Sequence, residues 1–228
     1  MKRLNVALLA IVFVLLYSTG VAAESQYKIV HKDQVTEGWE IHVDYPLFEQ
    51  LENKAIQERV NNDIIDKLEE KFRMVKRGAG ESIGIPYLYY EETIVYEEKE
   101  FFSVVMTSHI SRGDRYNSTV SSVNFVDGAA GEIRPLKEVV HMDRLNKAVE
   151  KIIQSDPDTY FQKTFRGVRD NTAYYLQKDK IVLVFNKYEV APGVFGTPEM
   201  SIPLKGMKKE HPKEKRAPVP SYTSAYLK

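Results

Sequence analysis

The feature that most constrains the fold is a run of apolar residues at helical spacing early in the chain. The apolar positions recur every three or four residues, and they are Ala55, Ile56, Val60, Ile64, Ile65, Leu68 and Phe72. This spacing puts them on one face, so we expect an amphipathic helix over residues 48–74 that ends at the loop Gly78-Ala79-Gly80. The apolar face of such a helix needs a second layer of structure to cover it.

Patterns typical of strands lie on both sides of this helix. Apolar and polar residues alternate from Trp39 to Tyr45, which predicts a half-buried strand that ends at Pro46. Three β-rich runs follow the helix, at residues 87–96, 101–110 and 118–125, and a loop comes after them at residues 127–135. Charged or turn-forming clusters separate the three runs, and this arrangement favours an antiparallel meander.

The second half of the chain has shorter elements. Apolar spacing predicts a helix that begins near Asp143 and is interrupted at Asp156-Pro157. We expect a further short helix that includes Tyr160 and Phe165. The last expected strands cover residues 173–176, 181–185 and 198–203, with a turn at residues 177–180 between the first two.

The order of these elements is strand, helix, three strands, helix and further strands, without the regular rhythm of a parallel sheet. It predicts an α+β fold, in which an antiparallel sheet packs against the long helix and a second, smaller α/β half follows. We place the first half at residues 27–130 and the second at residues 131–204. Residues 205–228 are basic and proline-rich, and this composition predicts a disordered tail.

The first 23 residues have the layout of a secretory signal peptide. Met1-Lys2-Arg3 is basic, the following run is almost wholly apolar, and Val21-Ala22-Ala23 offers small residues for cleavage before Glu24. The alternative is an uncleaved membrane anchor, since residues 4–23 approach the ~20 residues that span a bilayer. Both interpretations place the body of the protein outside the cytoplasm.

The sequence contains no cysteine. Disulfides, thiol nucleophiles, thiolate metal sites and a lipoprotein anchor are therefore excluded. A chain of this length buries a sizeable core without such cross-links. An exported protein without cysteine fits a bacterial cell envelope better than an animal secretory pathway, so we expect a secreted or envelope-associated bacterial protein.

Acidic residues dominate the body of the chain. The formal net charge is zero, but residues 205–228 hold seven basic and two acidic residues, and residues 24–204 hold 23 basic and 30 acidic residues. The acidic residues are densest in the segment EETIVYEEKE, where the candidate binding residues are Glu91, Glu92, Glu97, Glu98 and Glu100. An acidic face repels nucleic acid and attracts cationic partners, although such a surface also serves solubility alone.

Sequence motifs give no support to a catalytic or metal site. The five histidines are scattered, and the chain has no HExxH motif, calcium loop, P-loop, GxSxG elbow or GxGxxG fingerprint. Arg112-Gly113-Asp114 and the sequon Asn117-Ser118-Thr119 are short enough to arise by chance. Two of the 32 acidic residues could still sit together for glycoside hydrolysis, which keeps a hydrolase as a less favoured hypothesis.

The segment KYEVAPGVFGTPEMSIP, residues 187–203, combines prolines and glycines after an apolar run. Its motif residues are Tyr188, Glu189, Pro192, Gly196, Pro198 and Pro203. Prolines rigidify the chain, and the glycines at positions 193 and 196 permit positive φ. We expect a rigid elbow in which the Tyr188 ring is buried and Glu189 accepts hydrogen bonds from backbone amides. The alternative is a ligand-binding loop.

The longer stretch TAYYLQKDKIVLVFNKYEVAPGVFGTPEMSIPL, residues 172–204, resembles the C-terminal part of a bacterial extracytoplasmic domain. That domain occurs in the lysozyme-sensing anti-sigma factor RsiV and beside the catalytic domain of the peptidoglycan deacetylase PdaC. The family pattern is two strands, a Tyr-Glu-(Ile/Val)-Ala-Pro sequence, a glycine and a strand that ends in Ile-Pro. The matching residues are Tyr188, Glu189, Val190, Ala191, Pro192, Gly196, Ile202 and Pro203.

Two upstream segments extend this resemblance to residues 27–204. IHVDYPLFEQLENKAIQERVNNDI resembles the family's strand, Tyr-Pro step and helix, with an asparagine near Asn61 or Asn62. GEIRPLKEVV resembles the family's turn into its second helix. The chain departs from the family where SRGDRYNSTVSS replaces a Gly-Gly-Ala-His stretch. We also expect neither a cytoplasmic segment that holds a sigma factor nor a deacetylase domain.

The resemblance implies a non-enzymatic binding or sensor-like module of the cell envelope that recognises a lysozyme-like protein. The acidic body suits such a cationic partner. The alternative is a module for peptidoglycan or an anionic wall polymer, which would use the basic residues from Lys208 to Arg216. We expect no cofactor, metal or nucleic acid, and contact with the membrane only if residues 1–23 stay uncleaved.

Overall fold

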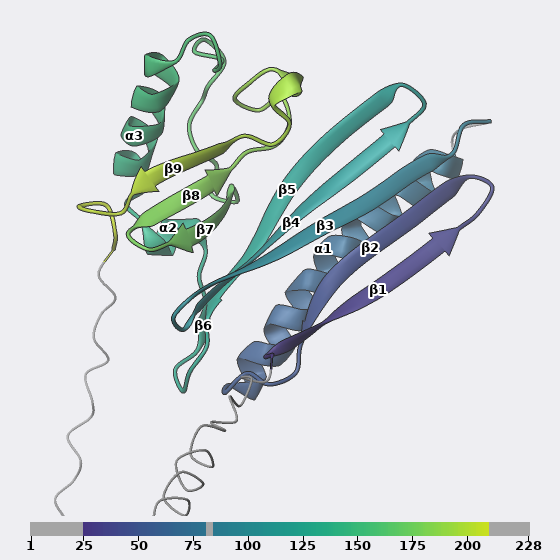
Figure 1. Cartoon of the computed structure of the whole chain (residues 1–228), viewed down its shortest axis with the longest axis horizontal. Coiled ribbons are helices and arrows are strands. Elements are labelled where there is room, and N and C mark those ends of the chain that lie inside the picture. The colour runs from purple at the N-terminus through teal and green to yellow at the C-terminus, as the bar shows by residue number, and fades with distance from the viewer. Residues whose placement is uncertain (1–24, 81–83, 210–228) are drawn as a thin grey trace, which may run out of the picture.

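The computed structural model describes residues 25–80 and 84–209, which form two lobes (Figure 1). The first lobe is one sheet, ordered β1 (Tyr27–Val35), β2 (Trp39–Phe48), β3 (Tyr87–Glu98), β4 (Phe101–Arg112), β5 (Arg115–Val126) and β6 (Glu132–Ile133). The second sheet is β7 (Ala173–Gln177), β8 (Lys180–Val184) and β9 (Glu199–Pro203). The helices are α1 (Lys54–Gly80), α2 (Leu136–Val139) and α3 (Met142–Ser155), and η1 (Gly193–Phe195) is a single 3₁₀ turn. The expected α+β class is confirmed.

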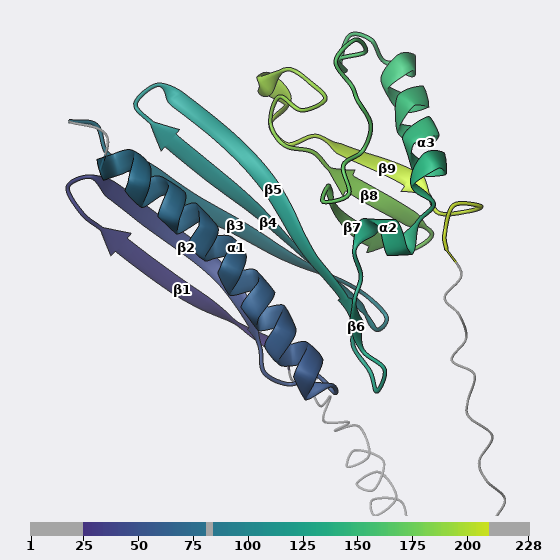
Figure 2. The same cartoon turned by 180° about the vertical axis from the view of Figure 1, so that it is seen from behind.

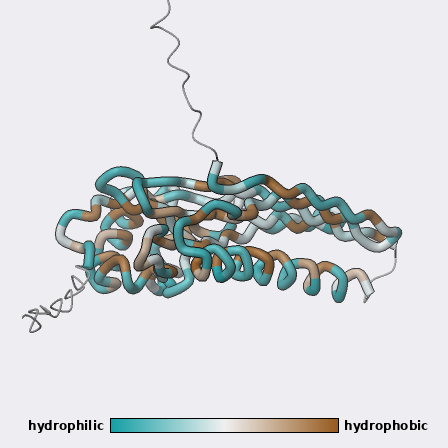
Figure 3. The backbone as a smooth tube through the Cα atoms, turned by 90° about the horizontal axis from the view of Figure 1, so that it is seen from below, coloured by the Kyte–Doolittle hydropathy of each residue, from teal (hydrophilic) through white to brown (hydrophobic). Residues whose placement is uncertain are grey.

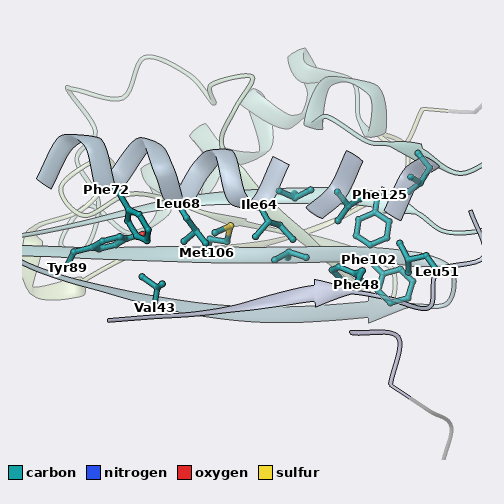
Figure 4. Close-up of a cluster of buried hydrophobic side chains, with 14 of the residues drawn as sticks. Val43, Phe48, Leu51, Ile64, Leu68, Phe72, Tyr89, Phe102, Met106 and Phe125 are labelled. Carbon is teal, nitrogen blue, oxygen red and sulfur yellow. The ribbon is translucent and has the colours of Figure 1, made fainter. Parts of the chain in front are cut away.

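The apolar stripe of α1 is buried against one face of the first sheet (Figures 2 and 4). Ile64 and Leu68 point from the helix into the strands, and Phe72 packs edge-to-face on the Tyr89 ring at 5.8 Å. At the other end of the helix, a cluster of three rings closes this core, formed by Phe48, Phe102 and Phe125. Each such side chain contributes about 1.5–3 kcal/mol by leaving water, so this layer holds the first lobe together.

Helix α1 begins later than the sequence pattern indicates, at Lys54 rather than near residue 48, and it continues to Gly80 through the glycines where a loop was expected. Two features move the start. Strand β2 continues through Phe48 because it pairs with β1 to that point. The Asn53 side chain then accepts hydrogen bonds from the backbone N–H groups of Ala55 and Ile56, at 3.1 and 3.2 Å. Such a cap satisfies amide groups that lack partners in the first turn and so fixes where the helix starts.

The meander β3–β4–β5 is antiparallel, as expected. The strand before the helix does not pair in the antiparallel direction with its neighbour β3. Strand β2 pairs in parallel with β3, and α1 forms the crossover between them. The sequence pattern also gave no sign of β1, which pairs antiparallel with β2 at the edge of the sheet. The first sheet is therefore mixed, and β3 lies between a parallel and an antiparallel neighbour.

The second lobe has its own core between α3 and the three-stranded sheet. Leu145, Val149 and Ile153 of α3 are buried among apolar side chains of β8 and β9. The short helix expected near Tyr160 and Phe165 is absent, and residues 156–172 form turns and irregular chain. Both rings still lie against the second core, because apolar anchoring does not require a helix.

The second sheet packs on part of the first sheet, on the face opposite α1. Tyr96 of β3 stacks on Tyr175 of β7 with ring centroids 3.8 Å apart, beside buried Val105 and Val120. The free edge of β5 is also covered, since the Val120 N–H donates to the Asn186 side chain at 2.7 Å. Covering an edge removes unpaired backbone groups that would otherwise pair with another chain.

The packed chain continues to Lys209, beyond the boundary expected at residue 204. Met207 is buried in the second core, Lys208 forms a β-bridge with Val140, and the Lys209 N–H donates to the Val139 carbonyl. A turn at Gly206, with φ 76°, brings Met207 back onto the lobe. Residues 1–23 and 210–228, to which the signal peptide and most of the tail were assigned, lie outside the described residues. None of the described helices is long and apolar enough to cross a membrane.

One side chain ties α1 to the end of β2 and offers a test of this packing. The Asn61 side chain accepts a hydrogen bond from the Phe48 N–H and donates one to the Phe48 carbonyl, both at 2.9 Å. We expect Asn61→Ala to lower the free energy of unfolding by about 1–3 kcal/mol, because Phe48 then keeps two buried backbone groups without partners. The exposed neighbour Asn62 is the control, and Asn62→Ala should change it by less than about 0.5 kcal/mol. Equal losses in urea unfolding would contradict this role.

Candidate binding surface

The five acidic residues singled out in the sequence do not form one face. Glu91 points toward α1 and is 1% exposed, whereas Glu92 lies on the opposite face of the sheet and is exposed. Glu98 accepts a hydrogen bond from the Lys178 N–H of the second lobe at 3.0 Å. Glu97, near the end of β3, and Glu100, in the turn to β4, are both exposed. Alternation along the strand separates side chains that are adjacent in sequence.

Glu91 belongs to the core of the first lobe. Its Oε2 accepts hydrogen bonds from the hydroxyls of Tyr89 and Ser108, at 2.5 and 2.7 Å. Its Oε1 is buried without a hydrogen-bond partner among the described residues. Burial disfavours the carboxylate and raises the pKa of Glu91 to about 7. A side chain in this position cannot contact a macromolecular partner, so Glu91 is not part of the candidate binding surface.

The exposed part of the sheet lies on the face opposite α1, beyond the area that the second sheet covers. We call it the open face. Figure 3 shows α1 along one side of the strands and no described element over the other side at the far end. Its large apolar side chains are 42–64% exposed, and they are Ile29, Val35, Leu88, Tyr90, Ile94 and Tyr116. Exposed apolar residues gathered on one face mark an interaction site more often than scattered ones do.

Acidic and histidine side chains share the open face. His31 of β1 lies between two carboxylates, with Nδ1 2.6 Å from Asp44 and Nε2 2.7 Å from Asp33. His42 of β2 contacts the other Asp33 oxygen at 2.8 Å, and Glu40 at 3.7 Å. The hydrogen bond to Asp44 is the largest cause that raises the pKa of His31, followed by the bond to Asp33. Hydrogen bonds to both histidines lower the pKa of Asp33.

A row of rings crosses the same face from β3 to β5. The His109 ring stacks between Tyr90 and Tyr116, with both centroid distances at 5.9 Å. Its Nδ1 lies 2.6 Å from the Tyr116 hydroxyl, and its Nε2 lies 3.8 Å from Glu92. The Lys187 ammonium sits over the Tyr116 ring at 4.2 Å. These contacts hold the rings in place, so they form a preorganised aromatic platform.

The elbow, residues 187–203, borders this platform. The Tyr188 ring was expected to be buried, but it is 57% exposed. The Tyr188 backbone takes φ 67°. Glu189 binds the Arg169 guanidinium through both oxygens, at 2.9 and 2.8 Å, and accepts the Asn186 N–H at 3.0 Å. The expected hydrogen bond of Glu189 to a backbone amide is therefore present. It fixes the turn that delivers Lys187 to the open face.

The two glycines of the elbow have different roles. Gly196 takes φ 63°, as expected, and has open space where a side chain would stand. Gly193 does not take positive φ, but the Tyr188 ring lies on its backbone where a Cβ would be. Pro192 precedes η1, and the Pro198 carbonyl accepts the Phe185 N–H at 2.9 Å as the chain enters β9, which ends at Pro203.

A polar cleft of about 780 Å³ lies elsewhere, between α1 and the second lobe. Asp63 and Lys67 line one wall, and Asp170 and Thr172 line the other. Partial burial raises the pKa of Asp63. Among the described residues, no three or more histidine or carboxylate side chains are placed to hold a metal ion. Exposed carboxylates also line this cleft, but its one aromatic lining residue among those described, Tyr174, is buried, so the cleft does not combine acidic groups with exposed rings as the open face does.

The sequence did not indicate the open face. Three of the five histidines gather there, although they are far apart in the chain, because β1 pairs with β2 and β3 pairs with both β2 and β4. The only available signal was the alternation of Leu88, Tyr90 and Glu92 with inward-facing residues. That signal needed the register of β1, which the sequence pattern did not reveal.

Comparisons with known proteins bear on the second lobe and on the fold. Residues 136–205 match the family described as a protein of unknown function, DUF3298. The chain is 22% identical over 179 residues to the anti-sigma-V factor RsiV of Bacillus subtilis (strain 168), a match that covers 72% of this chain and 62% of RsiV. The chain thus spans less than two-thirds of that relative. The resemblance to RsiV inferred from the Tyr-Glu-Val-Ala-Pro motif is confirmed.

A solved structure supports the fold. The crystal structure of a DUF3298 family member from Bacteroides fragilis NCTC 9343 matches with a TM-score of 0.52 and 14% sequence identity. The match covers 81% of this chain and 93% of that one. At this identity, the similarity concerns the arrangement of the chain alone.

The buried carboxyl of Glu91 makes stability depend on pH. Its pKa is raised on folding from about 4.5 to about 7, so its contribution to stability is present below pH 4.5 and is lost as pH rises to 7. We expect the free energy of unfolding of the parent chain to fall by about 3 kcal/mol between pH 5 and pH 8. Glu91→Gln should abolish this fall, as measured by urea unfolding. Glu97→Gln, on the exposed side of the turn, should leave the pH dependence unchanged. Equal pH slopes for the parent chain and Glu91→Gln would contradict this assignment.

The elbow allows a test by a double-mutant cycle. A Cβ at position 193 would overlap the Tyr188 ring, so we expect Gly193→Ala to destabilise the protein by about 1–3 kcal/mol. Tyr188→Ala should relieve most of that cost, because the overlap disappears. Gly196→Ala is the control, since its cost comes from positive φ and should persist without the ring. Additive effects of Gly193→Ala and Tyr188→Ala on thermal unfolding would contradict the contact.

Proposed function

We propose that this chain is a non-enzymatic binding or sensor-like module of the bacterial cell envelope. We further propose that it recognises a cationic, lysozyme-like protein through the open face. The observation that carries this proposal is the combination of exposed rings and exposed carboxylates on one rigid sheet. The similarity to an anti-sigma factor supports a regulatory rather than a catalytic role.

The charge of the open face fits a cationic partner. The carboxylates on it are Asp33, Glu40, Asp44 and Glu92. Lys187 is the basic side chain that reaches the platform. With neutral histidines the face has a net charge near −3, from four carboxylates and one ammonium. Complementary charge speeds the encounter with a basic protein and orients it.

The aromatic platform supplies anchors that charge alone does not. Tyr90 and Tyr116 are each 47% exposed, and each has one ring face against His109. Tyrosine is enriched at the energetic centres of protein interfaces because it buries a large area and loses little conformational freedom. Acidic groups around these rings would form the rim of such an interface.

The primary test is a calorimetric titration of residues 24–228 with an animal-type lysozyme at low and moderate salt. We expect micromolar or tighter binding that weakens as salt rises, because the attraction is partly electrostatic. The pair Tyr90→Ala and Tyr116→Ala should weaken binding about tenfold or more. Charge reversal of Glu92 to lysine should slow association and reduce its salt dependence.

Two variants away from the open face serve as controls. Glu97→Lys makes the same charge reversal near the end of β3, and Met74→Ala removes an exposed apolar side chain from α1. Neither should change the affinity by more than about twofold. No heat at either salt, or equal losses in controls and open-face variants, would overturn the proposal. Retention of the chain on isolated cell walls would then favour the wall-polymer alternative.

A further inference from the structure

The open face contains histidines in positions where a proton changes its charge. His31, His42 and His109 each have a carboxylate against the ring, at 2.6–3.8 Å. Lys32, on the same strand as His31, lies on the α1 side of the sheet, over the Phe72 ring. The protonation of the three rings therefore decides the charge of the surface that a partner would meet.

The geometry around His31 favours the protonated ring. Both ring nitrogens lie within hydrogen-bond distance of a carboxylate oxygen, one on Asp33 and one on Asp44. A neutral imidazole has a single N–H and can donate to only one of them, whereas the imidazolium donates to both. His42 repeats the arrangement less tightly, between Asp33 at 2.8 Å and Glu40 at 3.7 Å. The β1–β2 pairing thus makes a chain of alternating acids and bases.

His109 has a different environment. Its Nδ1 contacts the hydroxyls of Tyr116 and Ser118, and its Nε2 faces Glu92 at 3.8 Å. The hydroxyls can accept or donate, so they suit either protonation state. Rings on both sides hold the imidazole at the centre of the aromatic platform. A proton on His109 would therefore place a positive charge in the middle of the proposed contact area.

We infer that the open face binds cationic partners in a proton-linked manner, with tight binding at mildly alkaline pH and release on acidification. This inference rests on the proposed function. Protonation of three histidines changes the net charge from near −3 to near zero, because three positive charges join four carboxylates and one lysine. A partner that brings its own positive charges competes with these protons, so binding should release protons.

All titratable and charged groups that face the three rings take part in this balance. They are His31 and Asp33 on β1, Glu40, His42 and Asp44 on β2, Tyr90 and Glu92 on β3, Tyr116 on β5 and Lys187 on the elbow. Among side-chain types, the imidazole is the one whose ordinary charge change falls near neutral pH.

The experiment measures the affinity of residues 24–228 for a ten-residue lysine peptide and for animal-type lysozyme, at pH 5.5 and pH 8. We expect the affinity for both probes to fall about tenfold or more on acidification, since three exposed charge pairs are lost. A chain with His31→Asn, His42→Asn and His109→Asn should bind at pH 5.5 as it does at pH 8. His141→Asn, at the start of α3 in the second lobe, is the matched control and should keep the full pH dependence.

The two probes separate the two claims. If the lysine peptide binds in the expected pH-dependent way and lysozyme does not bind, the inference stands and the proposed partner is wrong. If the peptide binds equally at both pH values, or if the triple variant keeps the pH dependence, the inference is overturned. Failure of the peptide to bind at any pH would overturn it as well, because the face would then hold no cation.

Discussion

The burial of α1 against one side of the first sheet is the interaction on which the rest of the structure depends. The helix takes the inward-facing side chains of β2, β3 and β4 into one core, with Ile64 and Leu68 at its centre. Because side chains alternate along a strand, this choice also fixes which residues face the other way. The contents of the open face, including Tyr90 and Glu92, therefore follow from how α1 packs. A slip of one residue in β3 would bury Tyr90 and expose Glu91.

The second lobe decides how much of that outer face remains available. Its sheet covers the area around Tyr96 and Val105, and the elbow closes the β5 edge beside Tyr116. The uncovered area is a rigid surface of the first sheet, and the elbow is held in a fixed position at its border. The elbow, residues 187–203, lies at the border between the covered and the open parts of the outer face. It positions Lys187 and shields the edge of the sheet.

The sequence predicted the elements with strong periodicity and failed where pairing decided the outcome. The stripe of α1 and the β3–β5 meander were readable because their apolar residues repeat at 3.6 or 2 positions. Strand β1 was not, since its segment YKIVHKDQV is an edge strand with charged residues on both faces. The prediction of one acidic face was wrong because composition shows how many charges a segment has but not which way each side chain points. Glu91 points inward. The histidine and carboxylate contacts between β1 and β2 depend on a register that no local pattern encodes.

The open face is the proposed contact surface for a protein partner. Nuclear magnetic resonance of side chains tests it most directly, by following ring and methyl signals as animal-type lysozyme is added at pH 8. We expect changes at Tyr90, His109 and Tyr116, while the exposed methyl of Met74 on α1 stays unaffected. Changes at Met74 without changes in the three rings would contradict it.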